Sequence, residues 1–316
     1  MYDSIDKNNP FGESSSAFDM DLLTKLIRQQ TQSRPLFENI AILGCGYVGS
    51  AVADYWQDRG HDVTGTTTSR ERVAALAGIV SKVVLMKGDD LPAIHSLLEG
   101  QTTLVVSVAP TGFQVATETA YADTYITTTQ NLVDALAQAP NVKQIIYLSS
   151  CSVYGDRQGK WVDETTYIDP LEHSSQVLHQ SEQIILQAAN HNNQKVCVLR
   201  LGGIYGPDRE LVGMFGGMAG MTMPGKGDRF INWIHRDDIV GAIEFARLNE
   251  LEGIYNLVDD SQLTVKEQVK LVCSAYGLPQ VQWDTSKLSL GRKSLQVSNQ
   301  KLKAAGYDLI HPQILV

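Results

Sequence analysis

The amino-acid sequence predicts a doubly wound α/β fold, in which a parallel sheet carries helices on both faces and a smaller C-terminal lobe binds a substrate. Two observations predict it. From about residue 37, short apolar runs alternate with helical stretches, which is typical of a parallel sheet covered on both faces. The first run, at 39–43, leads directly into a glycine-rich segment, Gly44 to Gly49, and then into a helix.

The apolar runs mark the expected strands, which are 39–43, 61–66, 82–86, 103–109, 143–149, 195–201 and 253–258. Helices are expected between them: up to Gly60, around 72–76, after Pro92, and over 117–139, 174–190 and 265–276. The glycine- and methionine-rich segment 206–230 and the tail after 277 break this rhythm. Because ligands of such sheets bind outside the carboxyl ends of the strands, late insertions usually build the second wall of a cleft. A flexible surface loop is the competing interpretation of 206–230.

The glycine-rich segment has the G-x-G-x-x-G pattern of a dinucleotide-binding loop. In this Rossmann pattern Gly44 permits a tight turn, Gly46 lets the backbone approach a diphosphate, and Gly49 lets helix and strand pack closely. Tyr47 and Val48 of the loop are expected beside the cofactor, and the helix that follows (SAVADYWQDRG) offers N-terminal N–H groups and a dipole that favour phosphate. A strand before the loop, a helix after it and a second strand at 61–66 make a nicotinamide dinucleotide the expected cofactor.

The end of the second strand indicates which dinucleotide fits. A site for NAD usually has Asp or Glu there to bind the ribose 2′-hydroxyl. The segment 66–70 instead offers hydroxyl groups, including those of Thr67 and Ser69, and Arg70, whose guanidinium can bind a 2′-phosphate. We therefore expect NADP(H) rather than NAD. The alternative is that Arg70 is only a solvated residue in the first turn of the next helix.

These patterns divide the chain into three parts. Residues 1–35 form an N-terminal extension with a polar first part, followed by a short amphipathic helix that packs on the domain or on a partner. Residues 36–202, joined by 231–258, are assigned to the dinucleotide-binding domain. Residues 203–230 and 259–316 are assigned to the smaller substrate-binding lobe. The apolar residues of the amphipathic helix are Phe18, Leu22, Leu23, Leu26 and Ile27.

Composition and charge exclude several classes of partner. The formal net charge of -9 repels phosphate backbones and anionic membranes, so neither nucleic acid nor a membrane is expected as a partner. No apolar stretch is long enough to cross a bilayer, and the first residues do not resemble a signal peptide. The cysteines lie far apart without metal-ligand spacing, which indicates a cytoplasmic protein with reduced, buried thiols and no metal site. They are Cys45, Cys151, Cys197 and Cys273.

Several segments, in order and spacing, resemble the extended short-chain dehydrogenase/reductases, the group of nucleotide-sugar epimerases and dehydratases. The resemblance extends from about residue 39 to 308. The segments are Tyr147 to Asp156 (YLSSCSVYGD), Asp163 to Thr165 (DET), Arg200 to Pro207 (RLGGIYGP), Ile234 to Ile239 (IHRDDI) and Val297 to Asn299 (VSN).

The resemblance implies roles for the residues at matched positions. Ser150 falls on the catalytic Ser/Thr that hydrogen-bonds the reacting oxygen of the substrate, although a strand-end hydroxyl that only satisfies backbone groups is an equal alternative. Ala109 and Pro110 would line the adenosine-ribose side of the cofactor. Gly203 and Ile204 would contact its nicotinamide end.

The chain departs from the family at the catalytic pair. Family members carry Y-x-x-x-K on the helix after the matched loop, where Tyr is the general acid/base and Lys lowers its pKa. Aligning Glu182 with the family's Glu puts Ser174 and Leu178 at these positions, and no Y-x-x-x-K occurs anywhere in the sequence. His173, next to the vacated position, is the candidate proton donor.

These observations predict an NADP(H)-binding, atypical family member. We expect an oxidoreductase or epimerase-like enzyme that acts on a small carbonyl or sugar-type substrate. The alternative is a non-catalytic NADP-binding sensor or scaffold whose N-terminal helix contacts a partner. A homodimer is compatible with either interpretation.

Overall fold

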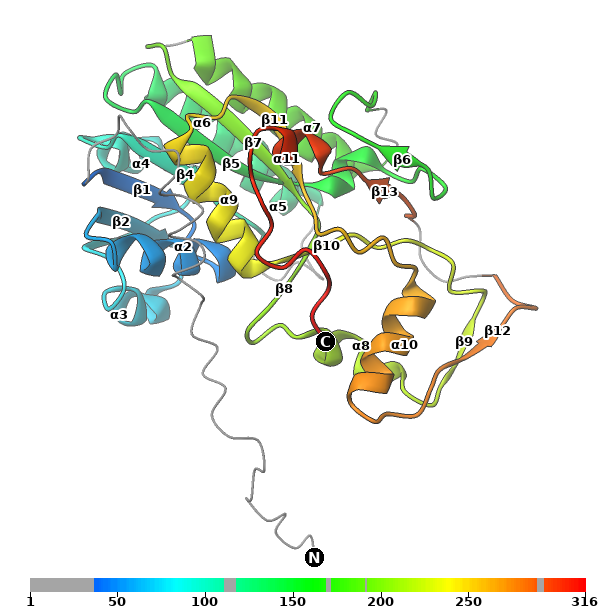
Figure 1. The fold of residues 1–316 in the computed structure, drawn as a ribbon. Helices are drawn as coiled ribbons and strands as arrows, with labels where there is room; N and C mark the ends of the chain where they lie inside the picture. The colour runs from blue at the N-terminus through cyan, green and yellow to red at the C-terminus, as the bar shows by residue number, and fades with distance from the viewer. Residues whose placement is uncertain (1–36, 111–117, 169–171, 191, 289–292) are drawn as a thin grey trace, which may run out of the picture.

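A computed structural model of the chain describes residues 37–110, 118–168, 172–190, 192–288 and 293–316. Its centre is a seven-stranded sheet in the order β11-β7-β5-β4-β1-β2-β3, with every pair parallel (Figure 1). The amphipathic helix expected before residue 35 lies outside the described residues. The strands of the sheet are β1 (Asn39–Leu43), β2 (Asp62–Thr67), β3 (Lys82–Leu85), β4 (Thr103–Val106), β5 (Gln144–Ser150), β7 (Lys195–Leu201) and β11 (Gly253–Leu257).

The chain winds outward from β1 in both directions. Ile42 of β1 is in register with Gly65 of β2 on one side and with Val105 of β4 on the other. The strand order therefore reverses between β1 and β4, which is the point where doubly wound sheets bind ligands at the carboxyl ends of their strands. The fold class predicted from the sequence is confirmed.

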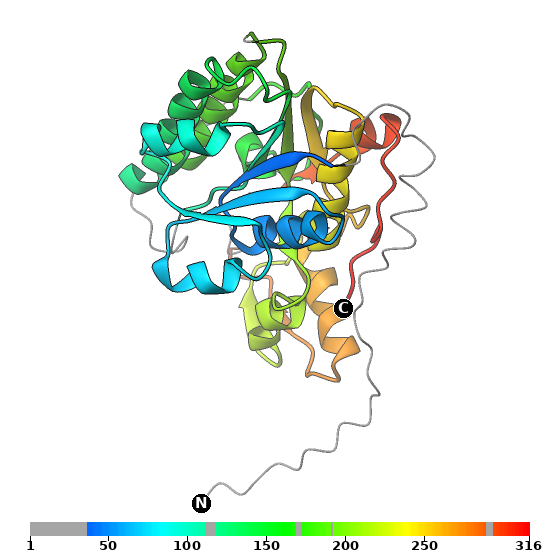
Figure 2. The ribbon, with the colours of Figure 1, turned by 90° about the vertical axis from the view of Figure 1, so that its left-hand side faces the viewer.

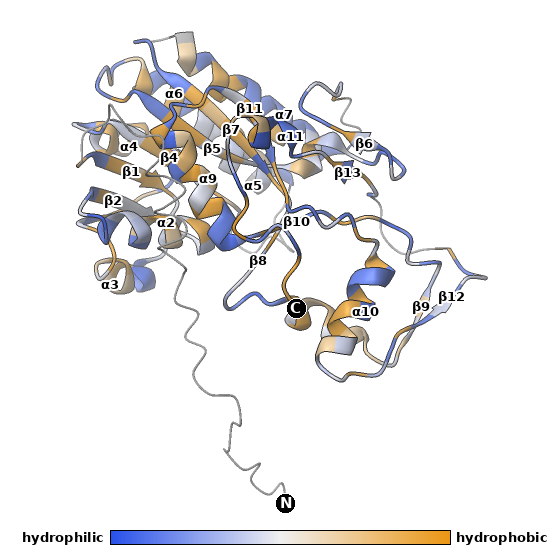
Figure 3. Cartoon of the chain, in the orientation of Figure 1, coloured by the Kyte–Doolittle hydropathy of each residue, from blue (hydrophilic) through white to orange (hydrophobic). Residues whose placement is uncertain are grey.

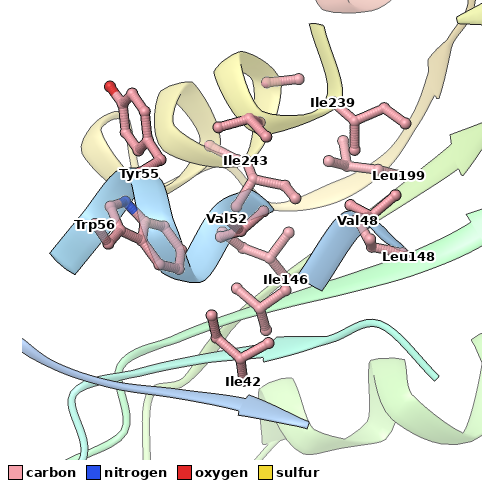
Figure 4. Close-up of a cluster of buried hydrophobic side chains, with 14 of the residues drawn as sticks. Ile42, Val48, Val52, Tyr55, Trp56, Ile146, Leu148, Leu199, Ile239 and Ile243 are labelled. Carbon is pink, nitrogen blue, oxygen red and sulfur yellow. The ribbon is translucent and has the colours of Figure 1, made fainter. Parts of the chain in front are cut away.

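Alternate residues of the strands face two separate cores, because successive side chains in a strand point to opposite faces. Ile40 and Ile42 of β1 pack beneath α2 (Tyr47–Gln57) and α9 (Arg236–Leu248), in the cluster that Figure 4 shows. Ala41 and Leu43 face the opposite core. That core is formed with α4 (Leu91–Leu98), α6 (Thr128–Leu136) and α7 (His173–Leu186).

Helices thus cover both faces of the sheet (Figure 2), and the central strands are mostly hydrophobic (Figure 3). No helix of the described residues is long and apolar enough to cross a membrane. Shorter elements complete this domain. They are η1 (Arg70–Arg72), α3 (Val73–Leu76), η3 (Cys151–Tyr154), η4 (Gln187–Asn190) and α11 (Gln300–Ala304).

The helix expected over 117–139 is interrupted. It consists of α5 (Glu118–Ala122), a π-helical turn η2 (Asp123–Thr127) and α6. The hydroxyl of Thr129 donates to the carbonyl oxygens of Tyr125 and Ile126, at 2.8 and 3.0 Å. Side-chain hydrogen bonds of this kind compete with the regular helical ladder, which is a local reason for the distortion.

A smaller lobe lies below the sheet in Figure 1 and is built from α8 (Leu211–Phe215), η5 (Gly216–Met218) and α10 (Val265–Ala275). Leu211 and Phe215 are buried there against Val269 and Val272 of α10. Three two-stranded parallel pairs link the lobe and the loops, and the sequence analysis missed them because runs of two or three residues show no periodicity. They are β6 (Trp161–Val162) with β13 (Gln296–Val297), β8 (Gly203–Tyr205) with β10 (Trp233–His235), and β9 (Thr222–Pro224) with β12 (Gln282–Asp284).

Candidate active site

The glycine loop connects β1 to α2 at the carboxyl edge of the sheet, and its three glycines have different surroundings. Gly44 has φ +97°, and a Cβ there would lie 2.6 Å from the carbonyl oxygen of Ser107. A Cβ at Gly49 would collide with the carbonyl oxygen of Gly44. A Cβ at Gly46 would meet no atom of the described residues within 4 Å. The fold therefore requires Gly44 and Gly49, whereas the described part of the chain leaves the space beside Gly46 open.

This free space lies at the N-terminus of an 11-residue helix, α2. Gly46 is the N-cap and no side chain caps the first N–H groups of the helix. Such N–H groups and the positive end of the helix dipole bind phosphate. The loop therefore fits the diphosphate of a dinucleotide, with Tyr47 and Val48 in the first turn beside it.

The end of β2 differs in part from the expectation. The hydroxyls of Thr66 and Thr67 are buried and accept hydrogen bonds from the backbone N–H groups of Gly44 and Ser69, at 2.8 and 3.1 Å. The Thr66 hydroxyl thus holds the glycine loop in place, and the Thr67 hydroxyl holds the turn that follows β2.

Charged groups gather just beyond this strand end. Arg70 is exposed, and Arg72 donates to the hydroxyl of Ser50 in the first turns of α2, at 3.2 Å. The carboxylate of Glu71 accepts a hydrogen bond from Ser69 at 2.6 Å, which lowers its pKa. Segment 66–70 contains no carboxylate, but Glu71, the next residue, places its carboxylate against Ser69. The choice of cofactor predicted from the sequence took no account of Arg72 or Glu71.

The residues assigned to the two ends of the cofactor lie at the same edge of the sheet. Ala109 and Pro110 follow β4, with Ala109 exposed and Pro110 buried. Gly203 and Ile204 belong to β8 and are in register with Trp233 and Ile234 of β10. A Cβ at Gly203 would lie 2.7 Å from the ring of Trp233, so the packing of this indole requires a glycine here.

Ser150 ends β5 at the carboxyl edge and is partly exposed. Its hydroxyl oxygen accepts a hydrogen bond from the backbone N–H of Ser152 at 3.1 Å, which leaves its O–H as a donor. The preceding residue, Ser149, is buried and donates to Glu182 of α7 at 2.6 Å. Ser149 therefore supports the core, whereas Ser150 is partly exposed at the carboxyl edge of the sheet.

A buried polar network holds β5, β7, β11 and α7 together behind Ser150. Arg200 forms a two-point ion pair with Glu182, with Nε–Oε1 and Nη2–Oε2 distances of 3.0 and 2.7 Å. Arg200 also donates to the hydroxyl of Tyr154 at 2.9 Å, and that hydroxyl donates to Asn256 at 2.8 Å. Burial raises the pKa of the Tyr154 phenol. The tyrosine of the matched V-Y-G segment is therefore structural.

The two positions that we align with the family's catalytic pair differ in burial. Ser174 is half-buried in the first turn of α7. Leu178 is 1% exposed and packs in an apolar cluster with Val153 and Tyr154. His173, the first residue of α7, is exposed. A cation at position 178 would thus lie inside a hydrophobic core rather than at the site.

A different lysine reaches the start of α7. The ammonium of Lys293 lies 2.9 Å from a carboxylate oxygen of Glu172 and 3.1 Å from the hydroxyl of Ser175. Ser175 in turn donates to the carbonyl oxygen of Ser152, two residues after Ser150, at 2.8 Å. Nothing in the sequence indicated this contact, because Lys293 and Ser175 are 118 positions apart.

The segment around His235 is occupied by structural hydrogen bonds. His235 caps α9 by accepting from the N–H of Asp237 at 3.2 Å, and burial lowers its pKa to about 4. The carboxylate of Asp238 accepts from the N–H groups of Ile310 and His311, at 2.6 and 3.0 Å. Ligand atoms of His235, Asp238 and His311 lie within 4.8 Å of one another, but these bonds already engage Nδ1 of His235 and both oxygens of Asp238.

All four cysteines are buried and unpaired, as the sequence analysis expected. Burial raises the pKa of the Cys45 thiol to about 11, so that this residue of the glycine loop stays protonated near neutral pH. The thiol of Cys151 donates to the carbonyl oxygen of Arg200 at 3.2 Å. These residues fill the core.

Comparisons with known proteins agree with this geometry. Residues 40–257 match the NAD dependent epimerase/dehydratase family. Protein YeeZ of Escherichia coli K12 is 31% identical over 290 residues, which cover 88% of this chain and 98% of that protein.

Solved structures share the fold. A UDP-glucose 4-epimerase from Thermotoga maritima, determined with UDP-glucose, is 20% identical, with a TM-score of 0.73 over 86% of this chain and 94% of that one. A dTDP-glucose 4,6-dehydratase from Streptomyces venezuelae, determined with NAD bound, is 18% identical, with a TM-score of 0.72 over 86% and 92%. With its doubly wound sheet, its glycine loop and the match over residues 40–257, the chain belongs to the NAD dependent epimerase/dehydratase family.

Proposed function

We propose that the chain is an NADP(H)-dependent oxidoreductase or epimerase-like enzyme that acts on a small carbonyl or sugar-type substrate. The observation that carries the proposal is the space beside Gly46, where a Cβ would meet no atom of the described residues within 4 Å, although Gly44 and Gly49 are packed against backbone. A glycine kept at a position where the fold does not need one is best explained by a ligand. The nicotinamide cofactor, when bound, supplies hydride transfer.

Preference for NADP(H) is supported by Arg70 and Arg72. Both lie just after β2, and Arg72 contacts Ser50 at the start of α2. Guanidinium groups bind phosphate in two-point fashion, which suits a ribose 2′-phosphate. Glu71 opposes this preference, but its carboxylate is engaged by Ser69 at 2.6 Å.

The substrate class rests on the relatives and on the second lobe. One structure of similar fold is an epimerase determined with UDP-glucose, and another is a dTDP-glucose 4,6-dehydratase determined with NAD. In this chain, the lobe built on α8 and α10 lies below the carboxyl edge of the sheet (Figure 1). We therefore propose a sugar-type substrate between the glycine loop and this lobe.

For the chemistry, we propose that Ser150 donates a hydrogen bond to the reacting oxygen of the substrate. Ser174 cannot act as an acid, because its hydroxyl does not ionise near neutral pH. His173 is our proposed proton donor, and Lys293 is the proposed cation at this end of α7. General acid catalysis contributes about 10²–10⁴-fold, so turnover with a misplaced donor should be slow.

A second function, binding of NADP without turnover, is favoured by one specific observation. Leu178 is 1% exposed within an apolar cluster, so the position of the family's lysine has become part of the core. A chain that had kept its chemistry would be expected to retain a cation there.

One experiment separates the two. Calorimetric titration with NADPH and NADH tests binding. Turnover is tested on a panel containing UDP-glucose, dTDP-glucose and simple carbonyl compounds, with the oxidised and the reduced cofactor. NADPH absorbance follows net oxidation or reduction, and chromatography of the products follows epimerisation, which leaves the cofactor unchanged. The enzyme proposal expects tight NADPH binding and measurable turnover of at least one compound. Binding without turnover across the panel would favour the non-catalytic function, and no binding of either dinucleotide would contradict both.

A further inference from the structure

Tyr47, the residue after Gly46 in the glycine loop, carries two guanidinium groups against its ring. The central carbon of Arg209 lies 4.8 Å from the ring centroid and that of Arg236 lies 5.0 Å from it. The Tyr47 hydroxyl donates to the carbonyl oxygen of Pro207 at 2.8 Å. This contact ties the loop after β8, which carries Arg209, to the glycine loop.

Both guanidinium groups have N–H donors without an acceptor among the described residues. Among the described residues, the side chain of Arg209 has no hydrogen-bonded or ion-paired partner besides the ring. Nε of Arg236 is buried without a hydrogen-bond acceptor in the described part of the chain. Asp237 lies at the limit of an ion pair with it, at 4.0 Å.

Two other arginines show what a structural role looks like in this protein. Arg200 is paired at two points with Glu182. Arg247 donates to Glu38 at 2.7 Å and to both carboxylate oxygens of Glu244, at 2.7 and 2.8 Å. Each of these buried guanidinium groups has its carboxylates within the fold. Arg209, by contrast, is exposed and pairs with no carboxylate of the described residues, and Arg236 is half-buried with only Asp237 at 4.0 Å, although both lie against Tyr47, the residue after Gly46.

We propose that Arg209 and Arg236 bind the diphosphate of the dinucleotide together with the N-terminus of α2. This inference rests on the proposed function, because it takes the glycine loop as the dinucleotide site. Guanidinium forks match phosphate oxygens, and two of them offset the two negative charges of the diphosphate.

The charges around Tyr47 show why positive groups would help a diphosphate to bind here. Asp208 and Asp237 flank the two arginines and act on Tyr47, whose pKa is raised mainly by burial. The whole chain has a formal net charge of -9. Without Arg209 and Arg236, these carboxylates would repel a diphosphate at the loop. Tyr47 holds both cations in place through its ring, at distances typical of cation–π contacts.

The test uses the full chain and calorimetric titration with NADPH, NADH and ADP-ribose, all of which contain the diphosphate. Arg209→Ala and Arg236→Ala should each weaken binding of all three ligands about tenfold or more, the effect of losing a charge-assisted hydrogen bond. Because the 2′-phosphate is not involved, NADPH and NADH should lose affinity equally. Arg209→Lys and Arg236→Lys, which keep the charge but not the fork, should lose less.

The matched control is Arg59→Ala. Arg59 also stacks on a tyrosine of α2, with its central carbon 3.6 Å from the Tyr55 ring, but at the other end of the helix. Its removal changes the net charge equally and should leave all three affinities unchanged.

If the wild-type chain binds the dinucleotides and the folded Ala and Lys variants bind them with the same affinity, the inference is overturned and the proposed function stays intact. An equal loss in Arg59→Ala would overturn it as well, by showing a general charge effect. UDP is titrated beside the other three ligands, and a loss of affinity confined to UDP would overturn the inference by assigning the arginines to a substrate diphosphate. Absence of dinucleotide binding by the wild-type chain would contradict the proposed function and this inference together.

Discussion

The glycine loop and the start of α7 lie at the same edge of one sheet, but their residues meet different demands. At the loop, Gly44 and Gly49 are held by backbone packing, whereas a Cβ at Gly46 would meet no atom of the described residues within 4 Å. At α7, the positions that we align with the family's catalytic pair hold the half-buried Ser174 and the buried Leu178. The comparison teaches that one end of this edge keeps space for a ligand, whereas the other is filled by an apolar side chain.

The two ends are also stabilised differently. The loop depends on neutral hydrogen bonds, such as that from Gly44 N–H to Thr66 at 2.8 Å. The α7 end depends on the buried ion pair of Glu182 and Arg200, with side chains 0% and 2% exposed. A buried pair of this kind holds an element in one position, and removing one partner is costly.

The largest expected effect is at the loop. Gly46→Val should abolish binding of NADPH and NADH, because the new side chain fills the space that the diphosphate needs. The protein should stay folded, since a Cβ there meets no atom of the described residues within 4 Å. Calorimetry measures the binding and thermal unfolding measures the fold.

Gly49→Ala is the control for this prediction. Its Cβ would collide with the carbonyl oxygen of Gly44, so we expect a lower melting temperature rather than a selective loss of binding. A folded Gly46→Val variant with unchanged NADPH affinity would end the dinucleotide interpretation of the loop.

At the other end, Leu178→Lys should destabilise the fold by about 2–5 kcal/mol, because it buries a cation in an apolar cluster. Leu178→Met, which nearly conserves volume, should cost less than about 1.5 kcal/mol. Denaturant unfolding measures both. If Leu178→Lys is as stable as Leu178→Met, the ammonium has left the apolar cluster. Position 178 would then be less committed to the core than we infer.

Restoring both groups tests the chemistry directly. Ser174→Tyr with Leu178→Lys should leave turnover low, because a cation at position 178 would lie in an apolar cluster rather than at the site. An increase towards about 10²–10⁴-fold would show instead that both groups have reached the site. The rate is measured on any substrate found in the panel, by the assay that detected its turnover. Ser174→Tyr alone, which leaves the core intact, is the control for losses caused by instability.

Cofactor choice is a smaller effect at the binding end. Arg70→Ala and Arg72→Ala should weaken NADPH more than NADH, by about 1.5–3 kcal/mol for whichever guanidinium pairs with the 2′-phosphate. Titrations of both variants with both cofactors measure it. Equal losses for the two cofactors would show that neither arginine discriminates between them.

The smallest expected effect on stability is at Lys293. Its side chain is 22% exposed and that of Glu172 is 39% exposed, so losing the pair in Lys293→Met should cost at most about 1 kcal/mol. Turnover should fall if this lysine supplies the cation at the start of α7. Lys287→Met, which removes an exposed pair with Asp284, is the matched control and should leave turnover unchanged. An active Lys293→Met variant would remove Lys293 from the site.

Much of the fold could be predicted from the sequence. The strands at 39–43 and 195–201 were predicted with their observed bounds, and the glycine loop was placed between a strand and a helix. The interruption of the helix at 123–127 and the short paired strands could not be predicted, because they depend on side-chain bonds and on pairing between distant segments. At the site, the hydroxyls of Thr66 and Thr67 face inward, which periodicity alone does not reveal.

The sequence by itself determined the doubly wound sheet, the glycine loop and the loss of the Y-x-x-x-K pair. These follow from local properties: the periodicity of apolar residues, the missing Cβ of glycine and the identity of single residues. Only the tertiary structure decided that Leu178 is core, that Lys293 reaches Ser175 from 118 positions away, and that Arg209 and Arg236 meet at Tyr47. The physical reason is that burial and charge pairing are set by which segments pack together, and long-range packing leaves no periodic signal in the chain.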